Sequence, residues 1–168
     1  MITPMEPEDW PAVCEIYRQG IATGNATFET ELPDWQTWNN SHRPDCRLVA
    51  RERKTVDRSD GMLLGWAALR PVSSRRVYAG VAEVSVYVAK IARGKGFGRL
   101  LLQSLVEESE GKGIWTLQAG IFPENIPSIK VHESLGFREI GLRSRIGKMG
   151  DLWRDVLLLE RRSATVGL

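Results

Sequence analysis

The chain has 168 residues, of which 42% are hydrophobic and 26% are charged, and its formal net charge is +2. This length suits one folded domain with a full core, and the composition is that of a soluble globular protein. The near-neutral charge and the lack of a basic, aromatic stripe argue against binding to nucleic acid or to a membrane surface.

The sequence also carries no export or membrane signal. Met1 is followed by prolines and acidic residues, and no apolar run is long enough to cross a membrane. We therefore expect a cytoplasmic protein. The two cysteines, Cys14 and Cys46, lack the spacing of metal ligands, so we expect them to be reduced and structural and expect no metal.

Hydrophobic periodicity and turn residues predict the elements in chain order. They are a short strand ending at Pro4, helices over 10–24 and 34–42, strands over 47–53 and 62–69 joined by a polar turn over 54–60, a long strand over 77–89, a helix over 96–111, a strand over 114–121, a helix over 126–135, and strands over 137–146 and 152–160. We predict one α/β (α+β) domain over residues 1–168, with a frayed tail over 161–168. Its sheet is mixed and mostly antiparallel, with six to seven strands and about four flanking helices.

The stretch over 83–102 is the most informative part of the chain. A strand rich in Val and Tyr runs into a basic turn with three alternate glycines, and an amphipathic helix begins near Gly96. The first N–H groups of a helix have no intrahelical partner and attract anions. Glycines allow close approach of the backbone, and Arg93, Lys95 and Arg99 add positive charge. The stretch therefore predicts a site for a phosphate-bearing ligand.

Two common phosphate-binding patterns do not match this turn. The dinucleotide fingerprint needs a glycine where the chain has Arg93 and a carboxylate after the next strand, and the Walker pattern is missing. The pattern that fits is Arg-x-x-Gly-x-Gly, which resembles the acetyl-CoA pyrophosphate loop of the GNAT N-acetyltransferase superfamily. The resemblance extends over nearly the whole chain and implies the GNAT fold with acetyl-CoA as co-substrate. It implies cofactor contacts from Val86, Tyr87, Val88, Arg93, Gly94, Lys95, Gly96, Phe97, Gly98 and Arg99.

A second segment, over 123–137, resembles the other GNAT signature. By this resemblance Asn125 and Ser128 contact the cofactor, and Gly136 and Phe137 close the short helix. Many members have a Tyr that protonates the departing thiolate, whereas this chain has His132 at that position. Together the motifs look like the phosphinothricin and methionine sulfoximine acetyltransferase branch, in which the residues matching Glu83 and His132 are the proposed catalytic pair.

The chemistry of acetyl transfer gives these residues definite tasks. Only a free amine attacks a thioester, so a carboxylate such as Glu83 can remove the proton from the ammonium, provided that partial burial raises its pKa. A backbone N–H near Tyr87 or Val88, where the strand separates from its neighbour, can stabilise the negative charge on the carbonyl oxygen. His132 can act as the base or as the acid for the thiolate. No nucleophilic residue is needed, because direct transfer requires only that both substrates are held together.

An amino-acid-like acceptor carries a carboxylate, so a positive patch is expected beside the pocket. Arg75 and Arg76 are the candidates for the acceptor carboxylate, although the loop after Arg70 is longer than in the family pattern. Phe28 and Glu29 resemble family positions that line the acceptor side. Trp153 closes the pocket or belongs to the core. The resemblance also implies a homodimer.

The interpretation is an N-acetyltransferase acting on the α-amine of a small amino-acid-like compound. One alternative is a GNAT enzyme that acetylates another small amine or a protein N-terminus. The other is a binding module that senses acetyl-CoA without chemistry, against which the presence of both Glu83 and His132 argues.

Overall fold

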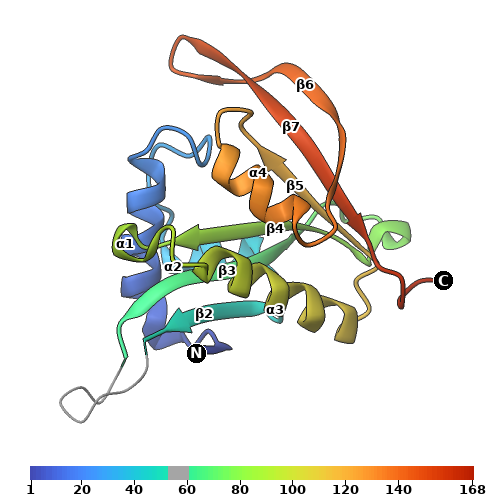
Figure 1. The fold of residues 1–168 in the computed structure, drawn as a ribbon, viewed down its shortest axis with the longest axis horizontal. Coiled ribbons are helices and arrows are strands. Elements are labelled where there is room, and N and C mark those ends of the chain that lie inside the picture. Colours follow the sequence, from blue (N-terminus) through green and yellow to red (C-terminus); the bar gives the residue numbers. More distant parts are fainter. Residues whose placement is uncertain (53–60) are drawn as a thin grey trace.

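The computed structural model describes residues 1–52 and 61–168. Within them the chain forms one seven-stranded sheet in the order β1-β2-β3-β4-β5-β7-β6, together with four α-helices (Figure 1). The strands are β1 (Ile2–Pro4), β2 (Arg47–Arg51), β3 (Leu63–Pro71), β4 (Val81–Val88), β5 (Thr116–Ile121), β6 (Arg138–Met149) and β7 (Leu152–Arg162). The helices are α1 (Trp10–Ile21), α2 (Trp35–Ser41), α3 (Phe97–Gly111) and α4 (Ile126–Glu133). The predicted fold class is confirmed.

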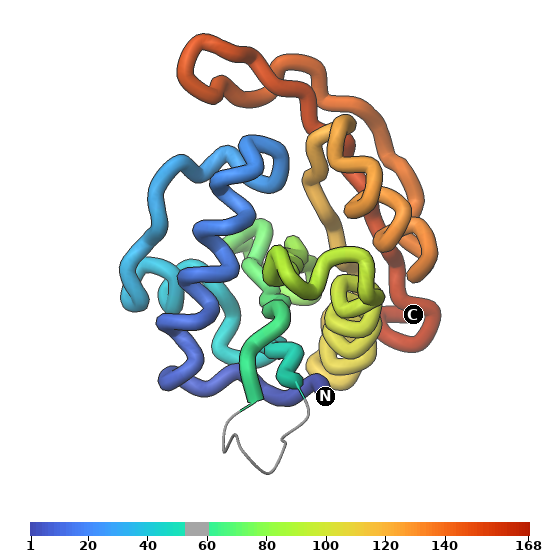
Figure 2. Tube along the Cα trace, turned by 60° about the vertical axis from the view of Figure 1, so that its left-hand side comes forward, coloured from blue at the N-terminus to red at the C-terminus, as the bar shows by residue number. Residues whose placement is uncertain are grey.

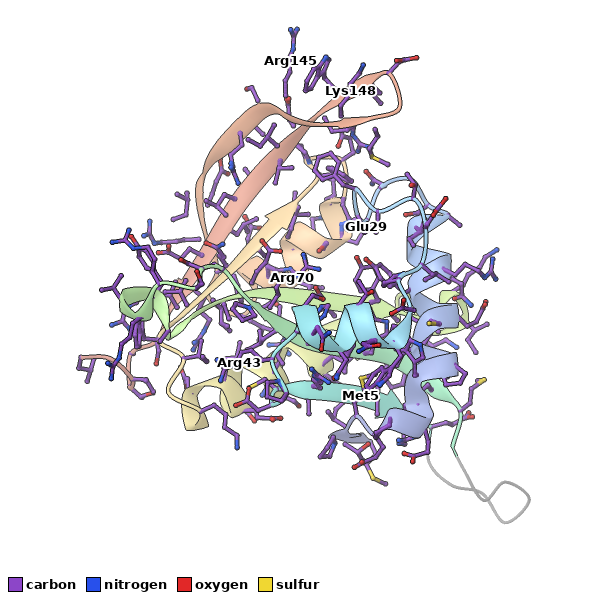
Figure 3. The ribbon with its side chains drawn as sticks, turned by 180° about the vertical axis from the view of Figure 1, so that it is seen from behind. Met5, Glu29, Arg43, Arg70, Arg145 and Lys148 are labelled. Atoms are coloured by element: carbon purple, nitrogen blue, oxygen red, sulfur yellow. The ribbon has the colours of Figure 1, made fainter. Side chains whose placement is uncertain are left out.

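The sheet is antiparallel except at one pair of strands. Strands β4 and β5 run parallel, because the chain crosses over through α3 between them. Helices α1 and α2 cover one face of the sheet, and α3 and α4 cover the other (Figures 1 and 3). No helix in the described ranges is both long and apolar enough to span a bilayer.

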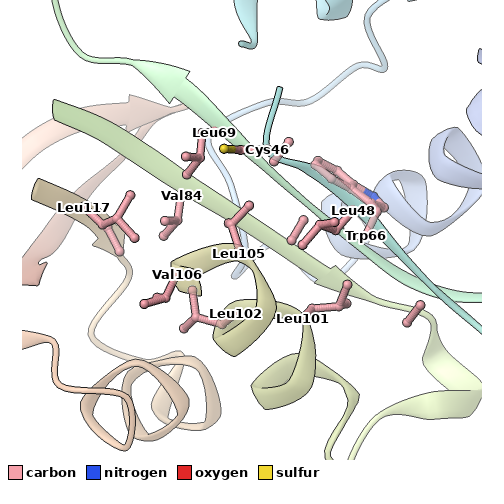
Figure 4. Close-up of a cluster of buried hydrophobic side chains, with 14 of the residues drawn as sticks. Cys46, Leu48, Trp66, Leu69, Val84, Leu101, Leu102, Leu105, Val106 and Leu117 are labelled. Atoms are coloured by element: carbon pink, nitrogen blue, oxygen red, sulfur yellow. The ribbon is translucent and has the colours of Figure 1, made fainter. Parts of the chain in front are cut away.

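The core fixes α3 against the middle of the sheet. Leu101, Leu102 and Leu105 recur at helical spacing and are fully buried (Figure 4). Gly65 on β3 allows this contact, since a Cβ there would lie 2.8 Å from Cδ1 of Leu101. The turn that precedes α3 is therefore held in a fixed position beside the end of β4.

Strands β4 and β5 separate partway along their length. They pair only from Val81↔Thr116 to Glu83↔Gln118, whereas β5 remains paired with β7 as far as Ile121↔Leu157. The edge of β4 from Val84 to Val88 therefore has no strand partner on the β5 side. This separation, visible in Figure 1, opens the centre of the sheet.

The central strand is shorter than predicted. Residues 77–80 are not strand: Arg76–Tyr78 forms the 3₁₀ turn η2, in which the N–H of Ala79 donates to the carbonyl of Arg76 (3.1 Å). Gly80 then packs so closely on Trp115 that a Cβ would lie 2.0 Å from the indole ring. The apolar residues of this segment, Val77 and Tyr78, are exposed in the turn, so they take part neither in strand pairing nor in the core.

The C-terminal segment is more ordered than predicted. Strand β7 continues to Arg162, and Arg161 pairs with Glu110 at 2.9 Å. The N–H of Ser163 donates to the carbonyl of Trp115 (2.8 Å), and Ser163 is buried. The predicted fraying is thus wrong for 161–163. Arg53 and the predicted turn over 54–60 lie outside the described residues.

Candidate active site

A cavity of about 580 Å³ lies where β4 and β5 separate. It is bounded by α1 and α2 with the loop between them, by α4, and by part of β6. Eight of the residues singled out from the sequence line it: Phe28, Glu29, Glu83, Val86, Tyr87, Asn125, Ser128 and His132. Segments far apart in the chain therefore contribute to one site.

The floor of the cavity is one face of the β3–β4 pair. Cross-strand neighbours on this face are Trp66↔Tyr87, Ala68↔Ser85 and Arg70↔Glu83. Residues directly opposite each other in an antiparallel pair share a face. The small Ala68 and Ser85 separate an aromatic pair from a charged pair, which leaves space between them.

Glu83 contributes a carboxylate to this floor. Within residues 1–52 and 61–168 it belongs to none of the ion pairs. The charged group opposite it is Arg70, which also lines the cavity. Figure 3 shows Arg70 and Glu29 between α2 and the β6–β7 hairpin. The Glu83 carboxylate thus faces the cavity, where it can contact the ammonium group of an acceptor.

His132 is buried on α4 and has a defined tautomer. Its Nδ1 lies 2.8 Å from the carbonyl oxygen of Ser128, and because a carbonyl can only accept, Nδ1 carries the hydrogen. The neutral imidazole therefore has its lone pair on Nε2. Burial lowers the pKa of His132, so this neutral form is favoured at physiological pH.

Aromatic residues form the inner wall of the cavity, and of these only Tyr87 was assigned to the site from the sequence. Tyr17 lies 4.8 Å from Tyr87, and Trp66 stacks on Tyr87 at 4.7 Å between ring centroids. His42 stacks on Trp38 at 4.2 Å, and burial lowers its pKa to about 4. Burial also raises the pKa of both tyrosines, so the phenols stay protonated. In the sequence, Tyr17 and Trp66 are aromatic residues of a helix face and of a strand, and core packing explains such residues equally well.

The glycine turn before α3 has the features of an anion cradle. Gly94 and Gly96 adopt positive φ values of 75° and 84°, and a Cβ on either would meet no atom within 4 Å. Gly96 is the N-cap of α3 and provides no side-chain acceptor to the N–H groups of the first turn. The exposed cations Lys95 and Arg99 flank this helix start. The donors and charges fit the diphosphate of coenzyme A.

Arg93 has a different place from the other cations of the turn. Its Nε donates to the carbonyl of Val88 (3.2 Å) and its Nη2 to the carbonyl of Gln19 (3.3 Å). The N–H of Lys90 donates to Oε1 of Gln19 (2.8 Å). Arg93 thus braces the turn against the end of α1.

The start of α4 forms the other half of the site. Asn125 is the N-cap of α4, and its Oδ1 accepts from the N–H of Ser128 at 3.4 Å. Asn125 and Ser128 both line the cavity, as does His132 one turn further on. The motif over 123–137 therefore presents its polar groups to the same space as Glu83.

Two expectations about the acceptor side do not match the structure. Arg75 and Arg76 lie at η2 and are not among the residues that line the cavity; the lining arginines in the described chain are Arg70 and Arg143. No signal in the sequence assigned Arg70 to the site, because only the register of β3 against β4 places it opposite Glu83. Trp153 neither closes the pocket nor lies in the core: it is 55% exposed on the β6–β7 hairpin.

No cluster of three or more His, Cys, Asp or Glu side chains suited to a metal ion occurs in 1–52 and 61–168. The site as described consists of a carboxylate, a neutral imidazole, arginines and a glycine turn. These groups are compatible with acyl transfer from coenzyme A.

Comparison with known proteins identifies the class. The model of the acetyltransferase (GNAT) family matches residues 10–137. The phosphinothricin N-acetyltransferase of Alcaligenes faecalis is 34% identical over 164 residues, which cover 92% of this chain and 78% of that protein. The chain belongs to the acetyltransferase (GNAT) family and is an N-acetyltransferase.

Solved structures agree with this assignment. Ribosomal-protein-alanine N-acetyltransferase from Brucella melitensis superposes with a TM-score of 0.86 at 32% identity, over 97% of this chain and 99% of that one. The phosphinothricin acetyltransferase of Sinorhizobium meliloti in complex with acetyl-CoA gives a TM-score of 0.86 at 27% identity, over 99% of this chain and 90% of that one. The fold and the family are thus shared with enzymes named for different acceptors.

Proposed function

We propose that this N-acetyltransferase moves the acetyl group of acetyl-CoA to the α-amine of a small amino-acid-like acceptor, of the phosphinothricin or methionine sulfoximine type. One observation carries the proposal. Glu83, His132 and Arg70 line a single cavity at the point where β4 and β5 separate. Bound acetyl-CoA supplies a thioester carbonyl at this point, and the protein supplies the groups that orient and deprotonate the amine.

Glu83 acts as the general base. Its carboxylate, directly or through a water molecule, takes the proton of the acceptor ammonium and leaves a free amine to attack. The edge of β4 near Tyr87 and Val88, which has no strand partner on the β5 side, offers backbone N–H groups to the carbonyl oxygen. Both groups belong to one short strand, so their spacing is fixed by the sheet.

His132 is the second proton acceptor. With Nδ1–H donating to Ser128, its Nε2 lone pair is available in the neutral state. Once protonated, the same nitrogen can return a proton to the thiolate of coenzyme A. This tautomer supports the order in which Nε2 first accepts a proton and then donates it to the thiolate.

Transfer is direct, without an acyl-enzyme. Cys14 and Cys46 are free thiols, and neither is among the cavity-lining residues of the described chain. Burial raises the pKa of Cys46 to about 12, so its thiol stays protonated and weakly nucleophilic. The reaction then depends on holding the two substrates in contact.

Arg70 and Arg143 bind the acidic groups of the acceptor. Both line the cavity, and the planar guanidinium pairs well with a carboxylate or a phosphinate. Phe28 and Glu29 also line the cavity. A zwitterionic acceptor would thus have its carboxylate near Arg70 and its ammonium near Glu83.

The enzyme works as a homodimer through the β6–β7 hairpin. Strand β6 is a sheet edge, and the hairpin exposes five large apolar side chains: Ile140, Leu142, Ile146, Leu152 and Trp153. Long apolar edge strands tend to pair with another chain. Sedimentation equilibrium should show a dimer for wild type and a monomer for Leu142→Lys. A wild-type monomer at micromolar concentration would contradict the proposed dimer.

Protein N-termini are the competing class of acceptor. The similarity to a ribosomal-protein-alanine N-acetyltransferase favours them. The cavity argues for small acceptors, since the loop between α1 and α2 and strand β6 both contribute to its walls. An acetyl-CoA sensor without chemistry is the remaining alternative.

The test is thiol release from acetyl-CoA over a panel of acceptors. The panel contains phosphinothricin, methionine sulfoximine, methionine sulfone, ordinary amino acids, a polyamine and a peptide with N-terminal alanine. We expect turnover of the first three, reduced about 10²- to 10⁴-fold in Glu83→Gln. Turnover of the peptide alone would favour the protein acceptor. Coenzyme A binding without any turnover would indicate a sensor.

A further inference from the structure

Arg154 lies where three segments of the chain meet. They are the loop between α1 and α2 (22–34), the loop between β5 and α4 (122–125), and the β6–β7 hairpin. Figures 1 and 2 show the first two loops side by side below the hairpin. Only 11% of the Arg154 side chain is exposed, although it carries a charge.

This guanidinium binds both loops at once. Its Nη1 donates to the carbonyl of Gly24 (2.9 Å), and its Nη2 donates to Oδ1 of Asn25 (3.1 Å). On the other side, Nη2 pairs with Glu124 (3.2 Å), and the guanidinium carbon lies 3.9 Å from the ring centroid of Phe122. Such a planar, multidentate arrangement needs arginine rather than lysine.

The loops also contact each other through residues that line the cavity. Nδ2 of Asn125 donates to the carbonyl of Asn25 (3.2 Å), and Phe28 meets Phe122 edge-on at 4.9 Å between centroids. Phe28 packs against Gly147 as well, where a Cβ would lie 2.5 Å from the phenyl ring. The positions of Phe28 and Asn125 therefore depend on the contact that Arg154 holds together.

We propose that Arg154 is a positioning residue that keeps the acceptor wall of the cavity in place. It is not among the cavity-lining residues of the described chain, so it acts through Phe28, whereas Asn125, the expected cofactor contact, is also held in place as the N-cap of α4. Without Arg154 the loop over 22–34 loses its contact with the β5–α4 loop. Part of the acceptor's binding free energy is then used to restore this contact, which weakens acceptor binding. This role rests on the proposed function, because it assumes that Phe28 faces the acceptor.

Kinetics of matched variants distinguish positioning from general stability. Arg154→Met keeps an unbranched apolar side chain over Phe122 but removes the donors. Arg154→Lys keeps the charge beside Glu124. The control is Arg138→Met, which removes an exposed arginine of the same hairpin, paired with Glu160.

We expect Arg154→Met to raise the acceptor KM about tenfold or more, with kcat and the KM for acetyl-CoA changed less than about threefold. Arg154→Lys should recover part of this loss, and Arg138→Met should equal wild type. A parallel change of every kinetic constant together with a lower Tm would instead mean a merely structural role and would overturn the proposal.

A second measurement needs no turnover. Hydrogen exchange of peptides covering 22–34, without substrates, should become about tenfold faster in Arg154→Met and stay unchanged in Arg138→Met. Exchange within β4 should be equal in all variants. Unchanged exchange over 22–34 would refute the proposal that Arg154 holds the loop in place. This outcome can be read even if wild type acetylates none of the tested acceptors, so it is separate from a failure of the proposed function.

Discussion

Arg70 and Glu83 lie directly opposite each other on β3 and β4, on the face of the sheet that forms the floor of the cavity. Ala68 and Ser85 are the next pair on that face. The site thus has a cation and an anion at one end and small residues beside them. This is the arrangement that a zwitterionic amino acid requires.

Arg70 should therefore determine the affinity for acceptors with a carboxylate. Replacement by Met removes a charge-assisted hydrogen bond, and we expect the acceptor KM to rise about 10- to 100-fold while the Kd for acetyl-CoA stays constant. Steady-state kinetics and calorimetry measure the two quantities. The double variant Arg75→Met/Arg76→Met is the control, because these arginines lie outside the cavity lining. A larger effect in the double variant would reverse the assignment.

Gly96→Ala should weaken acetyl-CoA binding without a steric clash. A Cβ at Gly96 meets no atom within 4 Å, but the φ of 84° costs an alanine about 1–2 kcal/mol. If the turn relaxes to relieve this strain, its N–H groups leave the diphosphate, and the Kd from calorimetry should rise about tenfold.

Gly111→Ala is the matched control for Gly96→Ala. It ends α3, has the same open surroundings and lacks a positive φ, so it should leave the Kd unchanged and stabilise the fold slightly. Equal acetyl-CoA affinity in both variants would remove the turn from the cofactor site.

His132 should act in its neutral form. Because burial lowers its pKa, the fall in kcat/KM that its protonation causes on the acidic side should lie below pH 6.5, the ordinary value. His132→Asn retains a donor for the carbonyl of Ser128 but has no titrating nitrogen. We expect it to keep the Tm and to lose about 10- to 100-fold in kcat. A His132→Asn enzyme with wild-type kcat would assign His132 to packing alone.

His42 should make the protein less stable in acid. Burial lowers its pKa to about 4 in the fold, whereas the unfolded value is about 6.5. Between these values the unfolded chain binds an extra proton, so the free energy of unfolding is unaffected above pH 6.5 and falls as the pH drops to 4. The full loss is about 3 kcal/mol.

Urea unfolding of wild type and His42→Asn over pH 4 to 8 measures this effect. The free energy of unfolding of the variant should depend less on pH, since one buried imidazole is gone while His132 remains. Parallel curves for the two proteins would mean that His42 does not cause the acid sensitivity.

The sequence sufficed for the parts of the fold that depend on local pattern. The spacing of Leu101, Leu105 and Val106 predicted α3, and the three glycines predicted the turn before it, because both signals lie within a few residues. The start of β4 was predicted too early. Gly80 packs against Trp115, which is remote in the chain, and a pattern of neighbouring residues cannot show this contact. The ordered end of β7 similarly depends on the Arg161–Glu110 pair across the fold.

The candidate site likewise divides into residues within local motifs, which the sequence revealed, and residues placed by remote contacts, which it did not. Glu83, Asn125 and His132 were found because their motifs are contiguous, and all three line the cavity. Arg70 was passed over in favour of Arg75 and Arg76, as proximity in sequence does not give the register of β3 against β4. Arg154 could not be found at all, since its partners lie in one loop more than a hundred residues away, over 22–34, and in the β5–α4 loop.

The position of the acetyl group in the product tests the proposed transfer to the α-amine most directly. Wild-type enzyme is incubated with acetyl-CoA and methionine sulfoximine, which carries both an α-amine and a sulfoximine nitrogen, and the product is fragmented by mass spectrometry. Direct transfer to the α-amine with Glu83 as the base should give a single acetyl group on the α-nitrogen, formed far more slowly by Glu83→Gln. An acetyl group on the sulfoximine nitrogen, or no acetylated product while an N-terminal alanine peptide is acetylated, would contradict it.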